Sequence, residues 1–239
     1  QLTGQAIAVN ATAAGAATLA INMASGATAD FSTLTFTAFG GNNAFDTAVD
    51  IISITGAAGA ENITGTSIAD TITGAGGADV LIGGAGNDIF VFNADDVVTG
   101  ETIAGDAGTD TISVLTSTDF STLTTATILT AGAVEQILIT SGQTATFTGV
   151  QLTGQAIAVN ATGAGPATLA INVATGTTAT FATLTFTAFG TNNAFDTGID
   201  VITITGAAGN ETITGTSIAD SINGAAGNDT LTGGLGDDT

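Results

Sequence analysis

The sequence predicts an all-β protein, a parallel β-roll or β-solenoid built from tandem 150-residue repeats. Three observations lead to this fold class: a long internal repeat, a nine-residue repeat inside it, and the lack of helical patterns. No long segment spaces its apolar residues at the helical period, and Thr and Gly are dense throughout. We therefore expect short strands in stacked coils along the whole chain.

The long repeat has a period of 150 residues. Residues 1–89 align with residues 151–239 without a gap, with 66 identities in 89 positions, and QLTGQAIAVNAT recurs unchanged. The chain thus holds one full repeat and part of a second. Since both ends fall inside the repeat pattern, we expect the array to continue in a longer natural protein.

The short repeat is nine residues long. From Gly56 the chain reads GAAGAENIT, GTSIADTIT, GAGGADVLI and GGAGNDIFV, and from Gly206 it reads GAAGNETIT, GTSIADSIN, GAAGNDTLT and the truncated GGLGDDT. Each complete nonamer has Gly at place one, a carboxylate at place six and an apolar residue at place eight. The first six residues suit a turn, and the last three suit a short strand with one inward side chain. Two nonamers then close one coil of 18 residues.

The charge balance requires a cation. The chain has 21 Asp and Glu but no Lys, Arg or His, for a net charge of -21. Stacked coils bring carboxylates 18 residues apart above one another at the interstrand spacing of about 4.8 Å. Two bare carboxylates at about 5 Å repel by roughly 3 kcal/mol at an effective dielectric constant of about 20. Carboxylates and turn carbonyls favour Ca²⁺, so we predict several bound calcium ions.

The nonamer GGAGNDIFV at residues 83–91 resembles the RTX, or haemolysin-type, calcium-binding repeat, whose pattern is GGxGxDxUx. The resemblance covers residues 56–91 and 206–239. It implies that each ion lies between coils, held by the place-six carboxylates and by turn carbonyls. It also implies export as an unfolded chain, often by type I secretion, and folding at an extracellular or cell-surface location. Proteins with such repeats include bacterial surface-layer proteins and large secreted adhesins.

The predicted metal ligands are the place-six carboxylates, with two further residues from the unit GDAGTDTIS at 105–113. They are Glu61, Asp70, Asp79, Asp88, Asp106, Asp110, Glu211, Asp220, Asp229 and Asp238.

These predicted ligands are not equivalent. Glu61 and Glu211 replace the usual Asp, and GTSIAD has Ile68 and Ile218 where the fourth-place Gly belongs. We expect those turns to bind weakly or not at all. The best candidates are Asp79, Asp88, Asp229 and Asp238, and the connecting stretch offers further possible ligands in Asp95, Asp96 and Glu101.

We divide the chain into four segments: a β-rich solenoid segment at 1–55, an RTX block at 56–113, a second solenoid segment at 114–205, and a truncated RTX block at 206–239. Short strands are expected in the solenoid segments, at AIAV, LAIN, TLTFT, IISIT, ISVL, QILIT and ATFT. A β-sandwich between the RTX blocks is the competing fold, and a helical turn in ATAAGAATLA is the less favoured local alternative.

Acidic residues beside the IISIT and VITIT strands have two interpretations. They either bind an ion or cap turns, and we favour capping; they are Asp46, Asp50, Asp196 and Asp200.

Composition removes most functions. Without His, Cys, Lys or Tyr the usual nucleophiles and imidazole bases are absent, and we predict no enzyme. Without Lys or Arg the chain cannot neutralise nucleic-acid phosphates. No apolar run reaches the ~18 residues of a membrane-spanning helix.

The leading hypothesis is a secreted, calcium-dependent structural repeat protein that associates with copies of itself. It would form a surface layer, an extracellular filament or an adhesin extender. The alternative is a ligand-binding adhesin module for glycans or, less favoured, ice. A regular Thr array would support ice binding, but the third nonamer place is mostly Ala.

Overall fold

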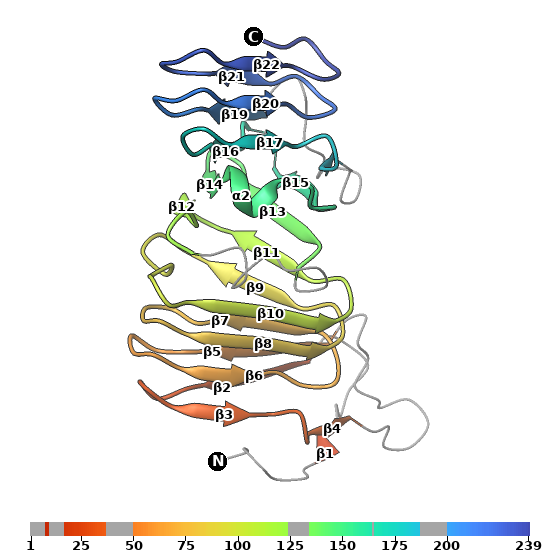
Figure 1. Ribbon diagram of the computed structural model, residues 1–239. Coiled ribbons are helices and arrows are strands. Elements are labelled where there is room, and N and C mark those ends of the chain that lie inside the picture. Colours follow the sequence, from red (N-terminus) through yellow and green to blue (C-terminus); the bar gives the residue numbers. More distant parts are fainter. Residues whose placement is uncertain (1–7, 10–16, 37–49, 124–133, 164, 187–199) are drawn as a thin grey trace.

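The computed structural model describes residues 8–9, 17–36, 50–123, 134–163, 165–186 and 200–239. These residues form an elongated stack of short strands, with the N-terminus at one end and the C-terminus at the other (Figure 1). Every pairing between described strands is parallel, as between Ile54 and Ile72 or between Ile112 and Ile137. The predicted all-β parallel roll is confirmed, and the antiparallel pairing of a β-sandwich does not occur among these strands.

The strands form four larger sheets and one pair. The long sheet contains β2 (Thr18–Asn22), β5 (Ile51–Thr55), β7 (Asp70–Thr73), β9 (Ile89–Phe92), β11 (Thr111–Val114), β13 (Gln136–Thr140), β15 (Ala158–Thr162) and β18 (Thr185–Phe186). The facing sheet contains β3 (Thr28–Asp30), β6 (Asn62–Thr64), β8 (Val80–Ala85) and β10 (Thr102–Ala107). The upper sheet contains β12 (Thr118–Asp119), β14 (Thr144–Thr148), β16 (Thr168–Asn172), β19 (Val201–Thr205) and β21 (Ser221–Asn223). The hydroxyl sheet contains β17 (Thr178–Thr180), β20 (Thr212–Thr214) and β22 (Thr230–Thr232), and β1 (Ala8–Val9) pairs with β4 (Thr35–Phe36).

Coil length follows the sequence. In the first nonamer block, strands alternate between the facing and long sheets, and Ile72 is aligned with Phe90, 18 residues later. Outside the blocks the aligned residues lie further apart, as with Leu19 and Ile52 or Ile112 and Ile137. Longer connections therefore lengthen the coil without changing which side chains face inward.

The two repeats use different sheets. Strand β2 lies in the long sheet, but its counterpart 150 residues later, β16, lies in the upper sheet. Likewise β3 lies in the facing sheet and its counterpart β17 in the hydroxyl sheet. Equivalent strands of the two repeats therefore belong to different sheets.

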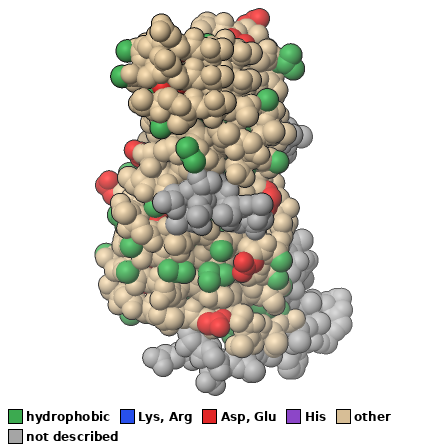
Figure 2. Space-filling model, in the orientation of Figure 1, with side chains coloured by type: hydrophobic (Ala, Val, Ile, Leu, Met, Phe, Trp, Pro, Cys, Tyr) green, Lys and Arg blue, Asp and Glu red, His purple; other side chains and the backbone are tan. Residues whose placement is uncertain are grey.

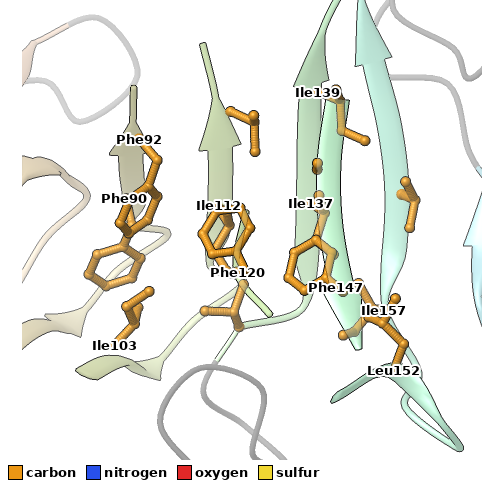
Figure 3. Close-up of a cluster of buried hydrophobic side chains, with 14 of the residues drawn as sticks. Phe90, Phe92, Ile103, Ile112, Phe120, Ile137, Ile139, Phe147, Leu152 and Ile157 are labelled. Carbon is orange, nitrogen blue, oxygen red and sulfur yellow. The ribbon is translucent and has the colours of Figure 1, made fainter. Parts of the chain in front are cut away.

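The core is narrow and follows the alternation of each strand. In β5, for example, Ile52 and Ile54 are buried while Ile51 is exposed. Between the two nonamer blocks the core contains phenylalanines packed with aliphatic side chains (Figure 3). The Phe120 ring stacks on Phe147 with centroids 4.8 Å apart, and Phe92 meets Phe120 edge-on at 5.3 Å. These rings fill the wider coils that small residues leave open.

A single helical turn, α2 (Gly149–Leu152), follows β14 and was not predicted. Thr148 and Gln151 form a capping box, and Gln151 Nε2 also donates to the carbonyls of Phe120 and Leu123, both at 2.8 Å. Four residues are too few for a periodic signal. The alternative helical turn in ATAAGAATLA lies largely outside the described residues, and its described end belongs to β2.

Candidate metal centre

The place-six carboxylates stack into ladders along the edges of the roll. Each stands at or just before the first residue of a strand, so strand register aligns them. The first ladder is Glu61, Asp79 and Glu101, and the second is Asp70, Asp88, Asp110 and Glu135. The second block repeats this arrangement: Asp229 stacks on Glu211, and Asp238 stacks on Asp220.

One hydrogen bond recurs at every rung. The backbone N–H of each ladder residue donates to a carboxylate oxygen of the next residue in the ladder. Glu61 N–H donates to Asp79 Oδ1 at 2.7 Å, and Asp88 N–H donates to Asp110 Oδ1 at 2.8 Å. This bond uses one oxygen of each accepting carboxylate. The turns therefore differ in whether the second oxygen has a hydrogen-bond partner.

In four turns both oxygens of the carboxylate accept hydrogen bonds from backbone N–H groups or from a threonine hydroxyl. Asp70 Oδ2 accepts from the N–H of Thr66 at 2.6 Å and Asp70 Oδ1 accepts from its hydroxyl at 3.2 Å. Glu61 accepts from the N–H groups of Gly26 and Ala57. The counterparts Glu211 and Asp220 have the same partners in the second repeat. Thr66 and Thr216 therefore do locally what a cation would do elsewhere.

Other ladder carboxylates lack a partner for the second oxygen. Among the described residues, Asp79 Oδ2, Asp88 Oδ2, Asp110 Oδ2 and Glu101 Oε1 are buried and have no hydrogen bond. Their side chains are at most 1% exposed. An unpaired buried carboxylate oxygen is costly, and the chain contains no basic side chain to pair with it.

Backbone conformation separates the same two kinds of turn. The turns that lead to Asp79, Asp88, Asp110, Asp229 and Asp238 have left-handed residues at both place two and place four. In the turn before Asp88, for instance, Gly84 has φ 104° and Gly86 has φ 124°. The turns before Glu61 and Asp70 have no left-handed residue at these places. Gly86 is required here, because an added Cβ would lie 2.5 Å from the backbone of the neighbouring coil.

The place-one glycines pack tightly against the place-six carboxylates. A Cβ added to Gly83 would lie 2.2 Å from Asp88 Oδ2, and one added to Gly74 would lie 2.4 Å from Asp79 Oδ2. On the adjacent turn, a Cβ added to Gly65 would lie 2.3 Å from the carbonyl oxygen of Gly83. Carboxylate and carbonyl oxygens thus converge around positions that any larger residue would fill.

Burial raises the pKa of the ladder carboxylates. Desolvation raises the pKa of Asp88 to about 7 and that of Asp79 to about 6, helped by the neighbouring carboxylates of Asp110 and Glu61 respectively. Desolvation, with a further contribution from Asp79, raises the pKa of Glu101 to about 8. Asp110 is shifted in the same direction by burial. The ladders therefore favour protons or another positive charge.

The remaining acidic residues have other positions. Asp106 is exposed at place two of its turn, with φ 67°. Asp50 Oδ1 accepts from Ala17 N–H at 2.7 Å, and Asp200 Oδ1 from Ala167 N–H at 2.7 Å, which agrees with the favoured capping role. Asp46 and Asp196 lie outside the described residues.

Two ladder members were missing from the predicted ligand set. Glu101 was considered only as a possible ligand in the connecting stretch, and Glu135 was not considered. Both residues lie at the ends of irregular coils that contain no recognisable nonamer. Their only sequence signal is therefore an acidic residue directly before an apolar strand.

The donor set fits a hard cation. Within the described part of the chain, no three acidic side chains gather at one point. Carboxylates alone therefore cannot surround an ion here, and turn carbonyls must supply further oxygens. The unpaired buried carboxylate oxygens and the nearby turn carbonyls suit Ca²⁺, which accepts six to eight oxygen ligands in flexible geometry.

The fold and these ladders define a β-roll whose glycine-rich turns carry stacked acidic residues. The family description "RTX calcium-binding nonapeptide repeat (4 copies)" matches residues 55–90 and 205–239. The chain therefore contains RTX calcium-binding repeats in these two segments.

No curated protein and no solved structure matched the chain. None of the helical residues described forms a segment both long and apolar enough to span a membrane.

Proposed function

We propose that the chain is a secreted structural repeat protein whose folding is controlled by calcium. One observation carries the proposal: the ladders hold buried, unpaired carboxylate oxygens in a chain without a single Lys, Arg or His. At neutral pH only a proton or an external cation can neutralise them, and the pKa values near 6 to 8 leave protonation incomplete as pH rises above neutral. The face shown in Figure 2 has few visible carboxylates, in keeping with their burial in the turns.

The proposed ligands are the carboxylates of the turns with two left-handed positions, namely Asp79, Asp88, Asp110, Asp229 and Asp238. Support comes from the turn geometry and, for the first three, from their unpaired oxygens. Bound calcium would supply positive charge between successive coils. In the other turns, hydrogen bonds from Thr66 and Thr216 or from backbone N–H groups already hold the acid.

The energetics give a switch. A site with the affinity of extracellular modules, about 10⁻⁴ to 10⁻³ M, is nearly empty at cytosolic calcium. At a calcium concentration ten times its Kd, such a site adds about 1.4 kcal/mol of stability. Several sites together reach the stability of an ordinary domain. The chain would therefore stay unfolded inside the cell and fold outside it.

Circular dichroism tests this switch directly. The calcium-free chain should show a disordered spectrum at neutral pH and become β-rich on addition of millimolar calcium, but not of equal ionic strength in NaCl. A β spectrum that is the same with and without calcium would refute the proposed mechanism.

The structural role is proposed as a surface layer, a filament or an adhesin extender made from self-associating or serial repeats. It is supported by the tandem repeat, by the solenoid arrangement and by the absence from the sequence of common catalytic side chains. Electron microscopy of the calcium-loaded protein separates these roles. Sheets or fibres indicate a layer or filament, whereas isolated rods indicate an extender.

A second candidate function rests on the hydroxyl sheet. Its outward threonines form two aligned rows, Thr178, Thr212 and Thr230 in one and Thr180, Thr214 and Thr232 in the other. The regular array that the third nonamer place lacks is thus present at places seven and nine. Such a surface could order water at an ice face. Thermal hysteresis measurements on the calcium-loaded chain, with Thr212→Tyr and the control Thr73→Tyr on the long sheet, test this role.

A further inference from the structure

We infer that Asp79 and Glu101 form an additional Ca²⁺ site at the edge of the roll, with Glu101 acting from outside the recognised nonamers. This inference rests on the proposed calcium-dependent function and extends it to a coil that the repeat pattern does not cover. Glu101 follows the connecting stretch between β9 and β10, beyond the matched segment that ends at residue 90.

Register places Glu101 in the ladder. Strand β10 pairs with β8 so that Thr102 is aligned with Val80, which puts Glu101 directly above Asp79. Asp79 N–H donates to Glu101 Oε2 at 3.4 Å, the same bond that Glu61 N–H makes to Asp79 Oδ1 at 2.7 Å. Glu101 therefore occupies the position of a place-six carboxylate in a coil of 22 residues.

The second carboxylate oxygen of Glu101 is buried and unpaired, as it is at Asp88 and Asp110. Glu101 is 1% exposed, and its Oε1 has no hydrogen-bond partner among the described residues. Asp79 is fully buried and its Oδ2 is unpaired as well. Two stacked acids that each retain an unpaired buried oxygen are stabilised by protons or, when ionised, by a cation that both carboxylates share.

Asp96, in the connecting stretch, adds negative charge to the surroundings of this pair without forming a three-acid cluster with it among the described residues. Asp96 lies close enough to contribute an unfavourable electrostatic interaction with both Asp79 and Glu101. Asp96 Oδ2 accepts from the backbone N–H of Asn93 at 2.7 Å, which fixes the loop around it. The loop thus adds negative charge beside the pair, which favours a divalent cation over a monovalent one.

The turn before Glu101 is irregular. The stretch before Glu101 lacks the two left-handed positions of the regular turns and has them instead at Asp95 and Gly100. From this different backbone path the Glu101 carboxylate still meets the N–H of Asp79, as a ladder residue does.

Calcium stoichiometry tests the inference. Equilibrium dialysis followed by atomic emission is performed on the wild-type chain, on Glu101→Gln and on Asp119→Asn, an exposed acid outside the ladders. We expect Glu101→Gln to lose roughly one calcium ion per chain, and Asp119→Asn to bind as many as the wild type. Equal stoichiometry and affinity in Glu101→Gln and wild type would overturn the site.

Two further measurements keep the result interpretable. Circular dichroism at saturating calcium shows whether Glu101→Gln folds; if it does not, Glu101→Asp decides. A calcium midpoint raised at least about threefold in Glu101→Asp supports the site, and an unchanged midpoint overturns it. If the wild-type chain binds no calcium at all, the proposed function itself fails. If the wild-type chain binds calcium and substitution of Glu101 changes neither stoichiometry nor affinity, only this additional site is refuted.

Discussion

Asp70 and Asp88 are joined across one coil: the backbone N–H of Asp70 donates to Asp88 Oδ1 at 2.8 Å, although 18 residues separate them. The two acids differ in their remaining bonds. Asp70 has both oxygens bonded to Thr66, while Asp88 Oδ2 is buried without a partner. Burial raises the pKa of both carboxyls to about 7, so the two neighbouring rungs differ in their hydrogen bonds rather than in desolvation, and the effect of this difference on calcium binding can be measured.

Neutralising Asp88 should harm calcium-dependent folding much more than neutralising Asp70. We expect Asp88→Asn to raise the calcium midpoint of folding at least about tenfold, which corresponds to about 1.4 kcal/mol. Asp70→Asn should change it less than about threefold, because Asn can still bond to both groups of Thr66. Calcium titrations followed by circular dichroism give both midpoints, and equal shifts would contradict the division into two kinds of turn.

The space beside Asp88 should be sensitive to a single methyl group. In Gly83→Ala the new Cβ would lie 2.2 Å from Asp88 Oδ2, so we expect a loss of about 1–3 kcal/mol in stability at saturating calcium. Gly76→Ala is the matched control, since the nearest atom to its Cβ is 3.9 Å away. Thermal unfolding of the two variants compares them. Similar melting temperatures would show that the space is not restricted.

The calcium-free chain should respond to pH in the opposite sense from most acidic proteins. Burial raises the pKa of Asp88 to about 7 and that of Glu101 to about 8, against ordinary values near 4. The folded state then binds more protons than the unfolded state, so this stabilisation is fully present below about pH 4 and is lost as pH rises through about 7 to 8.

Protein depleted of calcium on a chelating resin should therefore be β-rich near pH 5 and lose this signal between about pH 6 and 8. Circular dichroism across this range is the measurement, and a matching series at saturating calcium is the control. A calcium-free chain that loses structure on acidification instead would show that the carboxylates are not stabilised by protons.

The aromatic core between the two nonamer blocks should be essential to stability but not to calcium binding at individual turns. Phe120 is fully buried and stacks on Phe147, so Phe120→Ala should cost about 3–5 kcal/mol. Leu115→Ala, at a side chain that is 45% exposed, should cost far less. Chemical denaturation at saturating calcium measures both. The prediction fails if the two variants unfold at the same denaturant concentration.

Much of the fold followed from local sequence. The nonamer period predicted the 18-residue coil, and Ile72 is indeed aligned with Phe90 across one coil. The apolar place-eight residues were predicted to face inward, and Ile63, Ile72, Leu81 and Phe90 are all buried. A fixed period works because each turn and strand repeats the same backbone geometry, so one unit determines the next.

The candidate site was predictable only where the period holds. Asp79 and Asp88 could be assigned from spacing, but Glu101 and Glu135 end coils whose connections have no fixed length. Their place in the ladders depends on strand pairing between β8 and β10 and between β11 and β13. Pairing is a long-range property, and the sequence near these residues carries no regular signal for it.

The sequence by itself determined that stacked acids without basic partners line the turns of a parallel roll. It also marked which nonamers depart from the pattern. Only the tertiary structure decided which acids keep an unpaired oxygen, because Thr66 supplies two hydrogen bonds to Asp70 and no side chain among the described residues does so for Asp88. Strand pairing likewise decided that equivalent strands of the two repeats belong to different sheets. The identical sequence TLAIN forms β2 in the long sheet and β16 in the upper sheet.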